Sequence, residues 1–223
     1  MSSFGTLYSY PGNPRAAKIH AVANLSGLTI TDGAFTMGET NRSEAFLSKF
    51  PLGKVPTFTS ADGLNLFESG AIAAYVAENG PRREQLLGAT PAERAAIRQW
   101  IDLAENELTT HSMTCLIPRL GYRKFDEGAE AFAIQCMERV LAVLENHLSA
   151  AAGGRKFIAS ESLSLADITI AQSLTWGFKL VLDAEVRGKY PAVVEYFKRV
   201  LASEGVKEAF GEPEFVEKRT VPQ

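Results

Sequence analysis

The spacing of apolar and polar residues over the first eighty positions alternates between strand-like and helix-like patterns. Apolar positions at helical spacing predict helices at residues 14–26, closed by Gly27, and at residues 69–78. The Ala61-Asp62-Gly63 turn predicts a β-hairpin between two short apolar runs. We therefore expect a small α/β unit, in which four apolar runs predict strands at residues 6–10, 28–35, 55–60 and 64–67.

The pattern changes at residues 79–91, which contain two prolines and two glycines and predict a linker. Ser164 and Asp167 form a capping-box-like start for one later helix, because both side chains suit the free amides of a first turn. We predict a domain at residues 1–80, a linker at 81–90 and an all-helical domain at 91–223. The helical runs that support the second domain lie at residues 92–120, 127–150, 164–182 and 191–201.

Composition and charge narrow the choice of partners. Of the 223 residues, 46% are hydrophobic and 22% are charged, and the formal net charge is -3. Acidic residues are interspersed among the Lys and Arg residues, so we expect neither nucleic acid nor a membrane surface as a partner. No apolar run approaches the roughly 18 residues that span a bilayer, and no secretory pattern opens the chain. The ligand is expected to be a small molecule or a protein.

The cysteines and histidines do not predict a metal site. Cys115 and Cys136 lie in apolar helical stretches without CxxC spacing, which favours buried free thiols. His20, His111 and His147 are too dispersed for a metal triad. We therefore expect no metal cofactor.

The Val55-Pro56 bond stands at the start of a predicted strand. About 95% of X-Pro bonds in folded proteins are trans. A Pro here turns the N–H and C=O groups of Val55 outward, where an extended peptide pairs with them as a strand does, and this context favours the cis form. Both isomers stay open, and the context favours a peptide-like ligand.

Glu68 and Ser69 come where a predicted strand meets a predicted helix. The amides of a helix N-terminus attract a carboxylate, and the Glu68 side chain beside them accepts a hydrogen bond from an ammonium group. The pair therefore predicts a site for both charges of an α-amino acid head group. Taken alone, Ser69 is equally well explained as a helix N-cap.

The segment Lys54–Ser69, KVPTFTSADGLNLFES, resembles the glutathione-binding site of cytosolic glutathione transferases. The helical remainder is similar to their second domain, so the resemblance covers nearly the whole chain. It implies a thioredoxin-like α/β N-terminal domain followed by an all-α C-terminal domain. More narrowly, residues 40–58 and 66–77 resemble the transferase-like N-terminal region of elongation factor 1-gamma, and they are also similar to theta- and phi-like transferases.

This resemblance implies that glutathione binds as a substrate. The backbone of Val55 would pair with its cysteinyl unit, and Glu68 and Ser69 would hold its γ-glutamyl head. Arg42 and Lys54 fall where the family places residues that reach the glycine carboxylate, and the alternative for both is solvated surface charge. The expected glutathione-binding residues are Arg42, Lys54, Val55, Pro56, Glu68 and Ser69.

A donor that stabilises the glutathione thiolate is expected between Tyr8 and Asn13. Lowering a thiol pKa from about 8.5 by about two units takes about 2.7 kcal/mol. Family members place a Tyr, Ser or Cys in this region, whereas this chain has Asn13 where theta-like members have Ser. We rank Asn13 first, then Ser9, then Tyr8. Asn before Pro is also an ideal N-cap, which alone accounts for Asn13.

The absence of Cys from this stretch favours thiol addition to an electrophile over glutathionyl reduction. The second substrate is expected between the domains, against an apolar wall. Ordinary core packing explains the helical members of that wall as well. Its candidate residues are Tyr10, Thr109, Met113 and Leu116.

Two functions follow from the resemblance. The first is a dimeric, cytoplasmic glutathione transferase that conjugates glutathione to small hydrophobic electrophiles, as in detoxification. The alternative is a weakly active or non-catalytic scaffold module of the translation elongation factor 1 complex, with elongation factor subunits as partners. The motifs favour the scaffold, whereas a chain that stops at Gln223 without a lysine-rich linker favours the enzyme.

Overall fold

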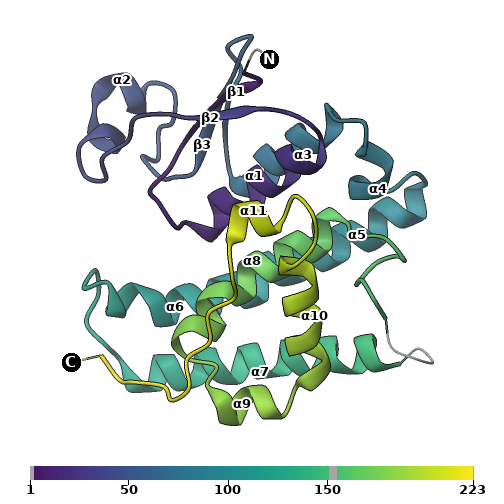
Figure 1. The fold of residues 1–223 in the computed structure, drawn as a ribbon. Helices are drawn as coiled ribbons and strands as arrows, with labels where there is room; N and C mark the ends of the chain where they lie inside the picture. The colour runs from purple at the N-terminus through teal and green to yellow at the C-terminus, as the bar shows by residue number, and fades with distance from the viewer. Residues whose placement is uncertain (1–2, 151–154, 223) are drawn as a thin grey trace. The chain divides into compact units, whose positions relative to one another are not determined.

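The computed structural model describes residues 3–150 and 155–222 (Figure 1). The chain divides into two compact units, one formed by Met1–Leu87 with Glu204–Gly211 and the other by Gly88–Ser203 with Glu212–Gln223. Strands and helices alternate in the first part of the chain, and the rest of the described chain contains helices alone. This order confirms the predicted fold class, an α/β region followed by an all-α region.

A four-stranded sheet in the order β2-β1-β3-β4 forms the centre of the first unit. β1 is parallel to β2 and antiparallel to β3, and β3 and β4 form the predicted hairpin. The strands are shorter than the apolar runs that predicted them: β2 is an edge strand limited by its single partner β1, and Pro56 has no N–H to give to a ladder, so β3 begins after it. The strands are β1 (Gly5–Tyr8), β2 (Ile30–Asp32), β3 (Thr57–Ser60) and β4 (Asn65–Phe67).

Helices cover the two faces of this sheet. On one face the ring of Phe58 lies 6.3 Å from the ring of Tyr75 in α3. On the other face the ring of Tyr8 meets that of Phe46 in α2 edge-on at 6.0 Å. The helices of this unit are α1 (Pro14–Leu25), the 3-10 turn η1 (Thr40–Arg42), α2 (Glu44–Leu47), α3 (Ser69–Glu78), α4 (Arg83–Leu87) and α11 (Lys207–Phe210).

Helix α4 lies inside the stretch that the sequence predicts as a linker. Its five residues contain neither Pro nor Gly, and Leu86 is fully buried. The prolines and glycines on either side of α4 favoured a linker in the sequence. A helix of five residues gives too short an apolar pattern to outweigh them. α11 also belongs to the first unit, although it comes late in the chain.

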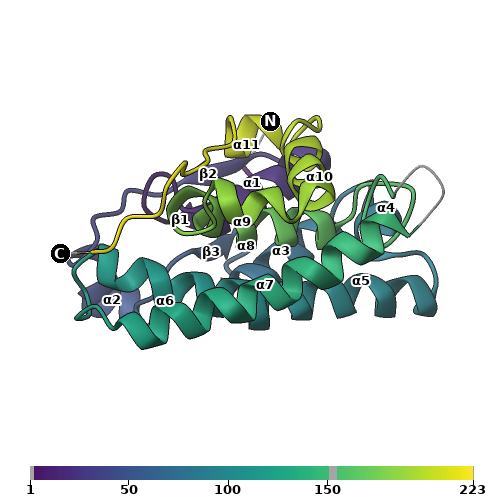
Figure 2. The same ribbon diagram turned by 90° about the horizontal axis from the view of Figure 1, so that it is seen from below.

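The second unit is built from helices, of which α6 and α7 pack side by side (Figure 2). α8 is its central helix, since most of its residues from Leu165 to Phe178 are buried. The long helix predicted at 92–120 is divided by a π-helical stretch, η2, which no residue pattern indicated. The elements are α5 (Pro91–Leu103), η2 (Ala104–Thr109), α6 (Thr110–Arg119), α7 (Glu127–Ser149), α8 (Leu165–Leu180), α9 (Ala184–Gly188) and α10 (Pro191–Leu201).

The predicted capping at the start of α8 has a buried carboxylate at its centre. Asp167 accepts hydrogen bonds from the backbone N–H of Ser164 at 2.8 Å and from that of Ile158 at 2.7 Å. The Tyr196 hydroxyl of α10 donates to the same carboxylate at 2.8 Å. One side chain thereby ties the helix start to a loop and to a second helix. In the described part of the chain, no helix is long and apolar enough to cross a membrane.

Candidate functional site

Three predicted site segments leave the sheet of the first unit at the same end. Tyr8 closes β1 and is the cross-strand partner of Thr57, which opens β3. Thr57 is in turn the partner of Phe67, which closes β4. The residues after β1, before β3 and after β4 therefore start from three neighbouring positions. These segments are 9–13, 55–56 and 68–69.

The Val55-Pro56 bond is cis, the form that its context favoured. Val55 is half-buried and lies outside the β3 ladder. Within the described part of the chain, its N–H and C=O groups make no hydrogen bond. Both groups are free to pair with an extended peptide backbone.

The start of α3 is open. Glu68 occupies its N-cap position with φ 69° and ψ 113°, and among the described residues no side chain caps this helix. Ser69, the first helical residue, is buried at 7% exposure. The first amides of an uncapped helix carry partial positive charge and attract a carboxylate.

Glu68 is the one non-glycine residue with positive φ in the described chain. A side chain held in this conformation costs about 1–3 kcal/mol, and such residues cluster at functional sites. The backbone at Glu68 therefore supports a role in the site independently of the side-chain charge.

Arg42 and Lys54 are exposed and lie on two segments that a third residue joins. The Asn41 side chain donates to the Gly53 carbonyl oxygen at 2.9 Å and accepts from the Gly38 N–H at 2.6 Å. Arg42 and Lys54 are the chain neighbours of this bonded pair, so their backbones are held close together.

Sequence reasoning missed the supporting roles of Asn41 and Gly53. Gly53 has φ 57°, and a Cβ atom there would lie 2.6 Å from the backbone oxygen of Asn41. Only glycine fits this approach. The glycine itself was the available signal, whereas the partner amide was visible only in the folded chain.

Asn13 caps α1, as its position before Pro14 predicted. Its Oδ1 accepts from the Arg15 N–H at 3.1 Å, and its Nδ2 donates to the Ser9 Oγ at 3.0 Å. Asn13 is 4% exposed, whereas Ser9 is half-buried. The structure therefore brings together the two candidates that the sequence ranked first.

Tyr8 is held by packing. Its ring contacts that of Phe46 and lies 6.3 Å from the ring of Phe50. A Cβ atom at Gly33 would come within 2.3 Å of the Tyr8 ring, so the glycine makes room for it. These contacts account for the aromatic side chain without a ligand.

The second-substrate candidates differ in exposure. Thr109 is 6% exposed and its hydroxyl lies 2.7 Å from that of Ser173 within the second unit. Leu116 is 2% exposed. Met113 and Tyr10 are half-buried. Burial favours a packing role for Thr109 and Leu116.

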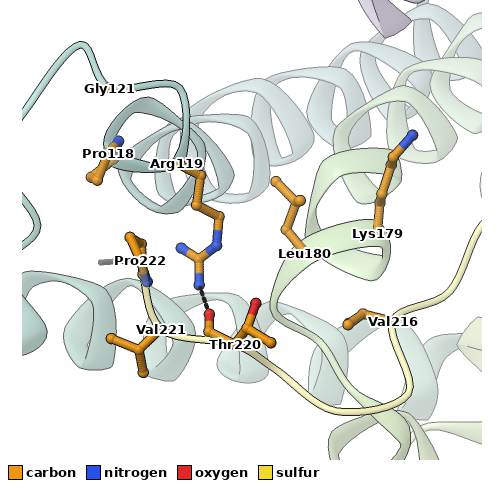
Figure 3. A pocket seen from close by; sticks show the side chains of 9 residues that line it. All are labelled: Pro118, Arg119, Gly121, Lys179, Leu180, Val216, Thr220, Val221 and Pro222. Atoms are coloured by element: carbon orange, nitrogen blue, oxygen red, sulfur yellow. Dashed lines mark hydrogen bonds between the residues drawn. The ribbon is translucent and has the colours of Figure 1, made fainter.

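A cavity of about 350 Å³ lies in the second unit, beside the end of α6 (Figure 3). The Arg119 guanidinium donates to the Thr220 carbonyl oxygen at 2.8 Å and is also paired with Glu130. Lys179 forms an ion pair with Glu214 at 2.7 Å. Both cations are thus paired with carboxylates, and Glu130 is shared with Arg219 at 3.5 Å. The lining residues are Pro118, Arg119, Gly121, Lys179, Leu180, Val216, Thr220, Val221 and Pro222.

Neither cysteine is an exposed thiol. Cys115 and Cys136 are both buried free thiols, as predicted. Burial, reinforced by the nearby Glu130 carboxylate, raises the pKa of the Cys115 thiol to about 11, so this thiol stays protonated near neutral pH. Among the described residues, no group of three His, Cys, Asp or Glu side chains is placed to hold a metal ion.

Comparison with known proteins shows two matching family models. The glutathione S-transferase N-terminal domain matches residues 3–78, and the glutathione S-transferase C-terminal domain matches residues 108–204. The chain is 43% identical to the glutathione S-transferase-like protein LUC7 of Fusarium sp over 99% of both chains. It is 41% identical to elongation factor 1-gamma of Carassius auratus, covering 96% of this chain and 47% of that protein.

The solved structures agree with these matches. The GST-like domain of elongation factor 1-gamma from Saccharomyces cerevisiae superimposes with a TM-score of 0.82 at 26% identity, over 100% of both chains. Both family models, the relatives and the fold therefore agree, and the chain belongs to the glutathione S-transferase family.

Proposed function

We propose that the protein is a glutathione transferase that joins the glutathione thiol to small hydrophobic electrophiles. One observation carries the proposal: the free backbone edge at Val55 and the open start of α3 at Ser69 lie at the same end of one sheet. A tripeptide with a charged α-amino acid head needs both features. Family membership supports glutathione as that tripeptide.

Each part of glutathione has a matching group. The cysteinyl backbone pairs with the N–H and C=O of Val55. The γ-glutamyl carboxylate lies on the first amides of α3, and its ammonium group donates to the Glu68 carboxylate. Arg42 and Lys54 are exposed and form the rim of the site, where they attract the glycine carboxylate.

The chemical step is thiolate attack. With a chlorinated nitroaromatic, the sulfur electron pair forms a C–S bond to the ring carbon that carries chlorine. The C–Cl bond breaks, chloride leaves with its electron pair, and the thiol proton goes to solvent. The protein contributes by stabilising the thiolate, because a free thiol of pKa near 8.5 is only a few per cent ionised at neutral pH.

Calorimetric titration with glutathione and a spectrophotometric assay with glutathione plus a chlorinated nitroaromatic test this proposal. We expect saturable binding and turnover above the uncatalysed rate. Binding without turnover over a panel of electrophiles would overturn the catalytic part, and the absence of binding would overturn the whole proposal.

A scaffold role in the elongation factor 1 complex is the second candidate. The 41% identity to elongation factor 1-gamma over nearly the whole chain favours it. Purified nucleotide-exchange subunits of elongation factor 1 in a pull-down would test it, with capture expected only under this second function. A homodimer is proposed for the first function, and light scattering measures it directly.

A further inference from the structure

We propose that Ser9, and not Asn13, donates the hydrogen bond to the glutathione thiolate, and that Asn13 is the positioning residue that orients the Ser9 hydroxyl. The inference rests on the proposed function. It assigns different roles to two neighbouring residues that sequence ranking alone treats as rivals.

The orientation of the Asn13 amide follows from chemistry. The Arg15 N–H, 3.1 Å away, is a donor and needs an acceptor, so Oδ1 must face it. Nδ2 must then face Ser9, whose Oγ lies 3.0 Å away. Asn13 is therefore the donor in its bond with Ser9, and the Ser9 Oγ is the acceptor.

This direction leaves the Ser9 hydroxyl hydrogen free to point elsewhere. A hydroxyl that accepts one hydrogen bond donates the next more strongly, an effect of roughly 10–30% per bond. A thiolate is an ionised acceptor, and hydrogen bonds to ionised groups are about twice as strong as neutral ones. Ser9 keeps its proton throughout, and the thiol proton leaves to solvent.

Accessibility separates the two residues as well. Asn13 is 4% exposed, and its amide accepts from the Arg15 N–H through Oδ1 and donates to the Ser9 Oγ through one of the two Nδ2 hydrogens. Ser9 is half-buried and follows Tyr8, the partner of Thr57. Ser9 and Pro56 are the chain neighbours of the paired residues Tyr8 and Thr57, on the side of the pair that leaves the sheet. Ser9 therefore starts from the same end of the β1–β3 pair as the Val55 edge proposed for the cysteinyl unit.

The test is the pKa of the bound glutathione thiol, followed by the ultraviolet absorbance of the thiolate as pH is raised. The variants are Ser9→Ala, Ser9→Thr, Asn13→Gly and the Ser9→Ala/Asn13→Gly double variant. Gly is chosen because it weakens an Asn N-cap by only a few tenths of a kcal/mol and brings no new donor. Ser26→Ala, at the far end of α1, is the matched control.

We expect Ser9→Ala to raise the bound thiol pKa by about one unit or more, which lowers the thiolate fraction about tenfold below that pKa. Asn13→Gly should raise it by about half as much, because the hydroxyl remains but is no longer oriented. The double variant should match Ser9→Ala, Ser9→Thr should restore the pKa, and Ser26→Ala should leave it unchanged.

Additive effects of the two single changes would overturn the inference, because they would make Asn13 a direct donor. An unchanged pKa in Ser9→Ala, or a rise of similar size in Tyr8→Phe, would overturn it too. These outcomes leave the proposed function standing if the wild-type protein still binds glutathione as a thiolate. If the wild-type protein shows no bound thiolate, both the proposed function and the inference fail.

Discussion

Two helices of the first unit begin at the same end of the sheet, and their starts are built differently. α1 begins with a side-chain cap, since the Oδ1 of Asn13 occupies the Arg15 N–H. α3 begins with Glu68 at positive φ and, among the described residues, with no side-chain cap. The partial positive charge of α1 is thus satisfied within the chain, whereas that of α3 is left for a ligand.

This difference separates binding from chemistry. An open helix start holds a carboxylate, which suits the head group of glutathione. A closed helix start orients a neighbouring hydroxyl, which suits the sulfur. The four changes below either remove this contrast or measure its size, and they run from the largest expected effect to the smallest.

Closing the open helix has the largest expected effect. Ser69→Asp places a carboxylate at the first turn of α3, where it takes the amides and repels the glutathione carboxylate. We expect affinity to fall about 100-fold, or about 2.7 kcal/mol, in calorimetry. Thr90→Asp, which keeps a capping side chain on α5 in the second unit and adds the same charge, is the control. A fall below threefold would contradict an open site at α3.

Changing Glu68 tests the backbone and the charge separately. Glu68→Gly and Glu68→Ala both remove the carboxylate, so we expect both to weaken glutathione binding about tenfold, or about 1.4 kcal/mol. Gly tolerates the positive φ of this position, and we expect it to be more stable than Ala by about 1 kcal/mol in urea unfolding. Equal stability of the two variants would argue that the conformation at Glu68 carries no cost.

Removing the side-chain cap of α1 should lower the free energy of unfolding and leave the affinity for glutathione nearly unchanged. Asn13→Ala removes the cap of α1, and we expect a loss of about 1 kcal/mol in urea unfolding. Asn13→Asp keeps an acceptor for the Arg15 N–H and should lose less. Glutathione affinity should change by less than twofold in Asn13→Ala. A collapse of affinity would show that the two helix starts do not divide the work as proposed.

Loosening the rim has the smallest expected effect. Asn41→Ala breaks the hydrogen bond to the Gly53 carbonyl and frees the segments that carry Arg42 and Lys54. We expect calorimetry to show affinity about threefold lower, since a net hydrogen bond is worth about 1 kcal/mol and exposed charges less. Asn65→Ala, on the exposed hairpin, provides the comparison. A larger loss than that of Glu68→Ala would move the main binding contribution to the rim.

Local signals predicted those elements that local chemistry controls. The start of α10 at Pro191 and the whole of α3 match the predicted ranges. The hairpin followed from its Asp62-Gly63 turn. The ends of β1 and β2 did not follow from the sequence, because the length of a strand depends on its partner strand. The sequence did not predict η2, because the apolar spacing runs through it without a break. It did not predict α4, because five residues are too few to show a helical spacing.

The sequence by itself determined the family, the α/β-then-helical order and the residue types of the site, because turn residues, helix caps and apolar spacing act over a few positions. Only the tertiary structure decided which groups are open and which are engaged. Pairing of β1 with β3 and of β3 with β4 brings distant segments to one end of the sheet. The direction of the Asn13–Ser9 hydrogen bond and the bridge from Asn41 to Gly53 depend on side-chain placement in three dimensions, which no pattern along the chain specifies.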